Sequence, residues 1–228
     1  MSRDQLVTDW VASRFPNQSV EITPASADAS FRRYFRLTWP DGGTRILMDA
    51  PPEKEDCRPF IHVAGLLAKA GLAAPRILDQ DLASGFLVLT DLGRVGYLDA
   101  LNADLSLADT LMRPVLDVLV KWQLSSRAGT LPPYDATLLR RELDLFPEWF
   151  VGRHLGYQLG DDEKCMLDRT FRLLINSALA QPKVFTHRDL MPRNLMVVES
   201  EAHLTPGIID FQDAVYGPIA YDVVSLFR

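Results

Sequence analysis

The spacing of apolar residues divides the chain into two parts. In the first ninety residues, helical spacing over residues 2–15 and 59–70 predicts two amphipathic helices. Asp41-Gly42 lies between two β-type runs and predicts a hairpin. This part predicts a small sheet with one helix between its third and fourth strands. The predicted strands cover residues 20–23, 34–39, 45–48, 76–78 and 86–90.

Beyond Asp91-Leu-Gly93 the apolar spacing becomes mostly helical. Pro147 lies inside one of the long helical segments and gives it a place to end. We expect an α+β fold with a small antiparallel sheet lobe over residues 1–92 and a larger, mostly helical lobe over residues 93–228. The helices of the second lobe are predicted over residues 105–127, 136–157 and 161–181, and short strands over residues 195–198 and 204–209.

Composition narrows the class of protein. The chain has 228 residues, 47% of them hydrophobic, and its net charge of −6 argues against a nucleic-acid partner. No apolar run approaches the roughly 20 residues that cross a membrane, and the N-terminus lacks the apolar stretch of a signal peptide. Cys57 and Cys165 have no metal-type spacing, which favours reduced thiols. Composition agrees with a soluble intracellular enzyme, which we expect to be cytoplasmic, monomeric and without a membrane partner.

Two short segments carry the candidate chemistry. His187-Arg-Asp-Leu-Met-Pro-Arg-Asn194 places an aspartate and an asparagine five residues apart, and Ile208-Ile-Asp-Phe211 ends an apolar run with a second aspartate. Phosphoryl transfer from ATP needs a carboxylate at the acceptor hydroxyl and oxygen ligands for Mg²⁺. We expect Asp189 to orient the acceptor hydroxyl, and Asn194 and Asp210 to bind Mg²⁺. The alternative is a polar turn that joins two strands.

These segments, together with Tyr221-Asp222, resemble those of the aminoglycoside phosphotransferase family of small-molecule kinases. The resemblance implies the bilobal fold of protein kinases. No Ala-Pro-Glu element or activation loop follows Asp210, which favours a small acceptor over a protein.

Four further segments resemble one branch of this family, the anomeric sugar kinases of cell-wall recycling. That branch phosphorylates the anomeric hydroxyl of N-acetylmuramate and N-acetylglucosamine in peptidoglycan recycling. The resemblance implies ATP and Mg²⁺ as cofactors and an amino sugar as substrate. Members of that branch continue beyond the point where this chain ends, so it also implies that the C-terminal part of the helical lobe is missing. The four segments are residues 30–36, 45–52, 142–149 and 210–214.

The predicted nucleotide side departs from the kinase pattern. The third strand of kinases supplies a lysine to the α- and β-phosphates, whereas Met48 or Asp49, neither of them a cation, holds that position here. The preceding segment includes Ser30 and Phe31, where small residues would let backbone amides approach an anion. We expect Arg32 or Arg33 to supply the missing charge, with a slight preference for Arg32. The alternative is that both arginines are solvated at a strand edge.

The strand over residues 86–90 leads into a predicted hinge. Adenine would lie against apolar side chains there and bond to backbone groups of Thr90, Asp91 and Leu92. The Asp91 side chain is expected either to contact the ribose or to cap the next helix, and capping is slightly favoured.

The acceptor pocket is encoded less sharply. Glu142, Asp144 and Trp149 lie near Pro147, and sugars are typically held by carboxylates with an aromatic face under the ring. Glu142 and Asp144 lie about 200° apart on a helix, so both face inward only if the helix ends there. Exposure of these charges to solvent is the alternative.

Four more residues are candidates for the acceptor side. His187 would either brace its loop by hydrogen bonding or contact the substrate. Arg188 would pair with a buried carboxylate such as Asp222, which is the favoured interpretation, or reach phosphate or sugar. Gln212 and Asp213 directly follow the metal aspartate.

Three other functions compete with a sugar kinase. A kinase of another small alcohol, such as an aminoglycoside, choline or homoserine, would use the same segments. A nucleotide-binding pseudokinase scaffold is favoured by the missing lysine and opposed by Asp189, Asn194 and Asp210. A metal-dependent hydrolase built on His62, His187 and the aspartates lacks a ligand-spaced histidine pair.

Overall fold

The computed structural model describes residues 2–27, 31–199 and 204–227. The chain forms two compact units. Unit 1 comprises Met1–Val118 and Pro192–Asp213, and unit 2 comprises Leu119–Met191 and Ala214–Arg228. The lobe boundary expected between residues 92 and 93 stays a prediction. No helix in the described ranges is long and apolar enough to cross a membrane.

Unit 1 is built on a five-stranded antiparallel sheet in the order β1-β2-β3-β5-β4. The predicted hairpin at Asp41-Gly42 is confirmed, since it joins β2 to β3, and the predicted helix between the third and fourth strands is α2 (Cys57–Lys69). The strands are β1 (Glu21–Ala27), β2 (Arg33–Thr38), β3 (Thr44–Asp49), β4 (Ile77–Asp81) and β5 (Phe86–Thr90).

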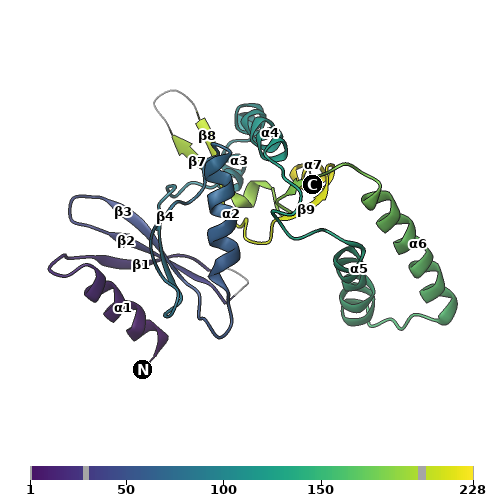
Figure 1. Cartoon of the computed structure of the whole chain (residues 1–228), viewed down its shortest axis with the longest axis horizontal. Helices are drawn as coiled ribbons and strands as arrows, with labels where there is room; N and C mark the ends of the chain where they lie inside the picture. The colour runs from purple at the N-terminus through teal and green to yellow at the C-terminus, as the bar shows by residue number, and fades with distance from the viewer. Residues whose placement is uncertain (1, 28–30, 200–203, 228) are drawn as a thin grey trace. The chain divides into compact units, whose positions relative to one another are not determined.

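Helix α1 (Arg3–Arg14) covers one face of this sheet (Figure 1). Its residues Val7, Trp10 and Val11 pack with Leu37 and Leu47 in one buried cluster. The helix begins where Ser2 Oγ accepts a hydrogen bond from Gln5 N–H, as helix N-caps do.

A buried ionic network joins α1 to the same face. Asp49 of β3 is fully buried and accepts hydrogen bonds from Arg3 Nε at 2.7 Å and from Arg33 Nη2 at 2.7 Å. Arg33 also donates to Asp4 of the helix at 2.5 Å. A buried carboxylate needs such partners, because leaving it unpaired would cost several kcal/mol.

The opposite face of the sheet carries a different row of side chains. Arg36 of β2 pairs in register with Ile46 of β3, which pairs with Leu89 of β5. Directly paired residues share a face, and so do residues two apart on one strand. Tyr34, two residues before Arg36, therefore lies on this face as well.

The remainder of unit 1 follows the sheet. Helix α3 (Tyr97–Ala103), which the apolar spacing did not predict, is followed by the short turn η1 (Leu105–Leu107) and by the start of α4 (Ala108–Leu124). The predicted short strands are confirmed as the hairpin β7 (Leu195–Glu199) and β8 (Leu204–Ile208), which follows the turn η3 (Pro192–Asn194).

Unit 2 is mostly helical. Helix α5 (Ala136–Leu145) changes into the π-helix η2 (Phe146–His154) beside Pro147, and α6 (Asp161–Leu179) follows. Strands β6 (Lys183–Thr186) and β9 (Val215–Pro218) form a two-stranded antiparallel sheet that was not predicted, and α7 (Tyr221–Leu226) comes last. The core of the unit contains Tyr134, Leu139, Ile175 and Val215.

Candidate functional site

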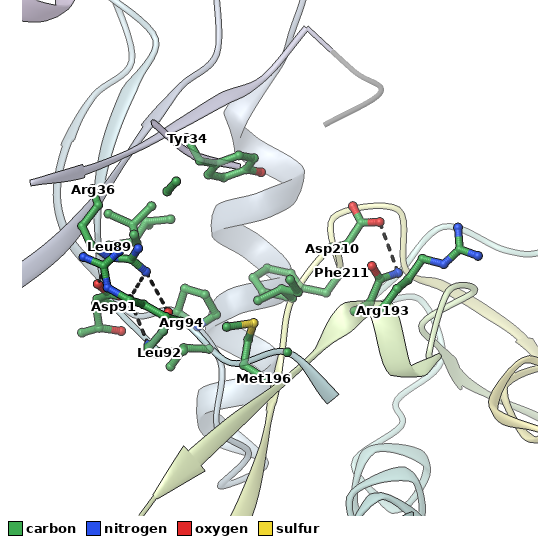
Figure 2. A pocket seen from close by; sticks show the side chains of 18 of the residues that line it. Tyr34, Arg36, Leu89, Asp91, Leu92, Arg94, Arg193, Met196, Asp210 and Phe211 are labelled. Atoms are coloured by element: carbon green, nitrogen blue, oxygen red, sulfur yellow. Dashed lines mark hydrogen bonds and ion pairs between the residues drawn. The ribbon is translucent and has the colours of Figure 1, made fainter. Parts of the chain in front are cut away.

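Unit 1 contains a pocket of about 560 Å³ (Figure 2). Its wall comes from β2, β3, the residues after β5, strand β7 and the segment after β8. The lining combines apolar side chains suited to a flat ring with polar groups at its ends. The apolar residues include Ile46, Leu89, Leu92, Met196 and Phe211, and the polar ones include Tyr34, Arg36, Asp91, Asn194 and Asp210.

The predicted hinge residues Thr90, Asp91 and Leu92 all line this pocket. Thr90 ends β5, where its N–H donates to Arg76 O at 2.9 Å and its hydroxyl accepts from Arg76 N–H at 2.9 Å. Within the described ranges, the backbone N–H and C=O groups of Leu92 have no hydrogen-bond partner. Those groups are therefore available to a ligand at the pocket wall.

Arg36 and Asp91 form a largely buried ion pair in the same wall, as Figure 2 shows. Arg36 Nε donates to Asp91 Oδ2 at 2.6 Å, and Arg36 Nη2 donates to Asp91 Oδ1 at 3.1 Å and to Gly93 O at 2.7 Å. Asp91 Oδ1 also accepts from Gly93 N–H at 2.9 Å. Both polar groups of the Gly93 backbone are thus bonded to this ion pair.

The electrostatics of the pair favour two charged partners. Burial alone would raise the pKa of the Asp91 carboxyl, but the hydrogen bonds from Arg36 and from Gly93 N–H outweigh it and lower that pKa. The hydrogen bond to Asp91 raises the pKa of Arg36. The expectation that Asp91 caps the next helix is wrong, because α3 begins at Gly96 without a side-chain cap.

Asn194 and Asp210 both line the pocket, and Figure 2 shows Asp210 on the side away from Arg36 and Asp91. Asn194 Nδ2 donates to Asp210 Oδ2 at 3.4 Å, and Gln212 Nε2 donates to Asp210 Oδ1 at 2.8 Å. Asp210 has a φ of +60°, a conformation that residues with a side chain seldom adopt. Such strain is concentrated at functional sites.

The donor set at this end suits Mg²⁺. One carboxylate and one amide oxygen are hard ligands, and Mg²⁺ is typically bound through one or two protein groups plus water and phosphate. In the described ranges, no group of three His, Cys, Asp or Glu residues is arranged to hold a metal.

The structure brings only some of the predicted phosphate-side residues near this pocket. Arg32 is largely buried and donates from Nη2 to Glu55 at 3.1 Å, and it also interacts with Tyr34, which lines the pocket. Arg33 lies on the α1 face of the sheet, and Met48 is fully buried. Phe31 is exposed, and Ser30 lies outside the described residues.

The loop that carries Asp189 belongs to unit 2. Asp222, buried at the start of α7, accepts from the backbone N–H of His187 at 2.7 Å and of Arg188 at 2.9 Å. Asp189 N–H in turn donates to His187 Nδ1 at 3.3 Å. Arg188 has a φ of +80°, so the loop, like Asp210, is held in an unfavourable backbone conformation.

These bonds fit the interpretation in which His187 braces the loop. The Asp222 carboxyl has a raised pKa of about 6, because its burial outweighs the two backbone hydrogen bonds and the nearby charge of Asp189 acts in the same direction as burial. No ion pair to Asp222 occurs within the part of the chain that the structure describes.

The Arg188 side chain pairs with Glu142, and not with Asp222 as we expected. Glu142 also accepts a hydrogen bond from the hydroxyl of Tyr134, whose pKa is raised by burial and by that bond. Asp144 points elsewhere, to Arg140 at 2.8 Å on the surface of α5. Glu142 and Asp144 thus diverge, as the angle between them on a helix requires.

Asp189 and Arg188 line a second pocket of about 380 Å³, which lies within unit 2. Met191, Tyr221, Val224 and Ser225 contribute to its wall. Trp149 is half exposed on η2 and is covered by Arg153, with 3.8 Å from the guanidinium to the ring centroid. Gln212 is buried in unit 1, and the adjacent Asp213 is exposed.

Sequence reasoning missed Tyr34 and Arg36. The signal was present in the alternation along β2, since Tyr34, Arg36 and the pocket residue Ile46 share one face of the sheet.

The profile of the phosphotransferase enzyme family matches residues 21–228. The chain belongs to this family. The match includes both strained loops, the sheet of unit 1 and the helices of unit 2. The resemblance predicted from the two segments at His187 and Ile208 is therefore confirmed.

Several curated members of the family are similar along most of the chain. An N-acetylmuramate/N-acetylglucosamine kinase of Pseudomonas aeruginosa is 51% identical over 239 residues, covering 100% of this chain and 68% of that protein. A kinase of the same name from Pseudomonas putida is 53% identical, covering 91% of this chain and 59% of that protein. A kinase of the same name from Neisseria meningitidis is 41% identical, covering 100% of this chain and 67% of that protein. The chain thus spans 59–68% of the length of these relatives.

Solved structures agree on the fold. The GDP complex of an aminoglycoside 2′-phosphotransferase gives a TM-score of 0.70 at 16% identity, covering 98% of this chain and 77% of that one. A choline kinase of Streptococcus pneumoniae gives a TM-score of 0.68 at 13% identity, covering 98% of this chain and 73% of that one. At such identities the likeness shows the fold alone, and it confirms the predicted α+β, kinase-like fold.

Proposed function

We propose that this chain is the catalytic part of an ATP- and Mg²⁺-dependent kinase that phosphorylates the anomeric hydroxyl of N-acetylmuramate and N-acetylglucosamine. The observation that carries the proposal is the identity of 51% along the whole chain with a kinase of that name. The two strained loops, which hold Asp189 and Asp210, support it, because phosphoryl transfer depends mainly on the placement of a few polar groups. Its work would belong to peptidoglycan recycling in the cytoplasm, and a monomer would suffice.

The pocket of unit 1 would hold the nucleotide. Adenine would lie between the apolar side chains of β3, β5 and β7 and bond to the free backbone groups of Leu92. Arg32 would supply the phosphate charge that Met48 cannot. It interacts with Tyr34 at the pocket wall, and Glu55 keeps its guanidinium oriented.

Asp210 and Asn194 would hold Mg²⁺ with their side-chain oxygens. When bound, the ion would neutralise phosphate charge as it builds up during transfer. Gln212 would orient the Asp210 carboxylate through the hydrogen bond that it donates to Oδ1.

Asp189 would orient the acceptor hydroxyl and accept its proton late in the transfer. The hydroxyl oxygen forms a bond to the γ-phosphorus, the bond from that phosphorus to the bridging oxygen breaks, and ADP leaves. Asp222 and His187 would fix the loop so that Asp189 does not need to be reorganised for each turnover. Arg188, Glu142, Asp144, Trp149 and Asp213 stay proposals for the acceptor side.

The test is to measure ADP release by the chain with ATP, Mg²⁺ and a panel of acceptors. We expect turnover with N-acetylmuramate and N-acetylglucosamine, and phosphorus NMR should show a sugar phosphate that mild acid hydrolyses, as an anomeric phosphate requires. Turnover with an aminoglycoside, choline or homoserine alone would replace the proposed acceptor. Nucleotide binding without turnover on any acceptor would instead favour a pseudokinase.

One variant and a matched control test the metal side in this assay. Asp210→Ala should weaken Mg²⁺-dependent ATP binding, whereas Asp109→Ala, which changes an exposed carboxylate on α4, should leave it unaltered. If Asp210→Ala keeps the Mg²⁺ dependence of the parent, the ion is bound elsewhere.

A further inference from the structure

The segment that follows β5 forms part of the pocket wall in unit 1. Side-chain hydrogen bonds hold this segment in place, and backbone pairing with a neighbouring strand does not. Thr90 is the last residue of β5, and the next backbone pairing recorded along the chain joins Val95 O to Val197 N at 2.9 Å. Between these two points, Gly93 has a φ of +102° and both of its backbone polar groups bond to the Arg36–Asp91 pair.

We propose that Arg36 and Asp91 form a clasp that positions the base of the bound nucleotide. The inference rests on the proposed nucleotide pocket and deepens it. Arg36 projects from β2 across Ile46 of β3 to reach the segment beyond β5, so the clasp spans the pocket face of the sheet. It occupies both backbone polar groups of Gly93, whereas the backbone groups of Leu92 have no hydrogen-bond partner within the described ranges and can bond the base.

The bonds that Arg36 makes distinguish this role from a direct contact with phosphate. Its guanidinium donates to both oxygens of Asp91 and to Gly93 O, so its hydrogen bonds are directed at the segment after β5. The Asp91 and Arg36 side chains are 6% and 9% exposed, so little of either is left for a ligand. Arg36 is therefore a positioning residue, and it should matter equally for ligands with and without phosphates.

The location of the clasp distinguishes it from a purely structural pair. The Asp49 network on the opposite face also joins arginines to a buried aspartate, but its bonds lead to α1 and to Ser84 and not to the pocket. Loss of the clasp should alter nucleotide binding at temperatures where the protein is still folded.

The experiment measures dissociation constants for adenosine and for ADP by calorimetry, well below the unfolding temperature of each variant. Arg36→Met should weaken both ligands by the same factor, roughly 10-fold, because the ligand must then itself order the segment that the charge-assisted bonds of Arg36 held in place. Arg36→Lys should recover part of the loss. Arg113→Met removes an exposed arginine–aspartate pair of the same unit and should leave both constants unchanged.

Turnover provides the second readout. With N-acetylmuramate as acceptor, Arg36→Met should raise the KM for ATP while kcat and the sugar KM stay near the parent values. A loss for ADP without a loss for adenosine would mean that Arg36 binds phosphate directly, and unchanged constants in a folded Arg36→Met would overturn the clasp.

The outcomes of the parent protein separate this inference from the proposed function. If the parent binds nucleotide but phosphorylates no sugar, the proposed acceptor fails and the clasp is still decided by the adenosine and ADP constants. If the parent binds neither adenosine nor ADP, both proposals are wrong.

Discussion

Asp91 in unit 1 and Asp222 in unit 2 each hold a backbone segment in place, but the two carboxylates differ in their partners. Each is a largely buried aspartate that accepts backbone N–H groups from a segment on which we base a functional proposal. Asp91 accepts a hydrogen bond from Gly93 N–H and forms an ion pair with Arg36. Asp222 accepts hydrogen bonds from the N–H groups of His187 and Arg188, and it makes no ion pair among the described residues.

The difference has a consequence for charge. The bonds from Arg36 and Gly93 lower the pKa of Asp91, while burial raises the pKa of Asp222 to about 6. The segment after β5 is thus held by a carboxylate that stays ionised at every physiological pH. The loop of Asp189 is held by one that titrates close to neutrality.

The largest expected effect comes from removing the carboxylate of Asp189, which lies on the loop that Asp222 holds. Asp189→Asn should lower kcat by roughly 1,000-fold, in the range of a lost acid–base group, because the amide cannot accept the acceptor proton. The dissociation constant of ADP should change little. Steady-state kinetics with N-acetylmuramate and calorimetry with ADP check the two halves. A variant with near-parental turnover would remove Asp189 from the mechanism.

The second prediction concerns the charge of Asp222 itself. Its folded pKa of about 6 lies above the ordinary 3.8, so the native state binds more protons than the unfolded state between these values. The unfolding free energy of the parent should therefore fall relative to that of Asp222→Asn as the pH rises from about 4 to 7, by about 2 kcal/mol over this range.

Denaturant unfolding at fixed ionic strength over that pH range measures the difference. Asp109→Asn changes an exposed carboxylate whose pKa is lowered, so its difference from the parent should stay level above pH 5. A level difference for Asp222→Asn as well would mean that Asp222 stays ionised in the folded protein.

The third prediction concerns two arginines that pair with carboxylates, one expected to bind the nucleotide and the other to stabilise the fold. Arg32 and Arg33 are neighbours, but Arg32 bonds Glu55 and interacts with Tyr34, while Arg33 bonds Asp49 and Asp4 on the α1 face. Arg32→Met should weaken ADP binding by roughly 10- to 150-fold, the value of one charge-assisted hydrogen bond. Arg33→Met should lower the unfolding temperature and leave ADP binding unchanged.

Calorimetry with ADP and thermal unfolding of both variants measure the two effects. Equal ADP affinity in both variants and the parent would place the phosphate charge elsewhere. A loss of ADP affinity in Arg33→Met alone would assign the phosphate-binding role to Arg33 and not to Arg32.

Local sequence predicted those parts of the molecule in which one segment carries its own signal. The hairpin at Asp41-Gly42 and the aspartate that ends the apolar run at Asp210 both depend on residues close in the chain. The hydrogen bonds of Asp222 to the loop of Asp189 span 34 and 35 residues, and only the family resemblance pointed to that region.

The rest depends on contacts that spacing does not encode. Arg188 pairs with Glu142, 46 residues away, because the fold of unit 2 places α5 beside the loop. Arg36 reaches Asp91, 55 residues away, across an intervening strand. Strands β6 and β9 were missed because each has only four residues, too few for alternation to stand out.

The smallest expected effect tests the Asp91 side of the comparison. Because the pKa of Asp91 is lowered and its charge is matched by Arg36, the clasp should stay intact between pH 5 and 7.5. Adenosine carries no phosphate whose titration would interfere, so its dissociation constant should change by less than about 2-fold over this range. In Asp91→Asn the binding should be weaker but equally flat. A parent affinity that falls as the pH approaches 5 would show that Asp91 takes up a proton there, and the contrast with Asp222 would then be lost.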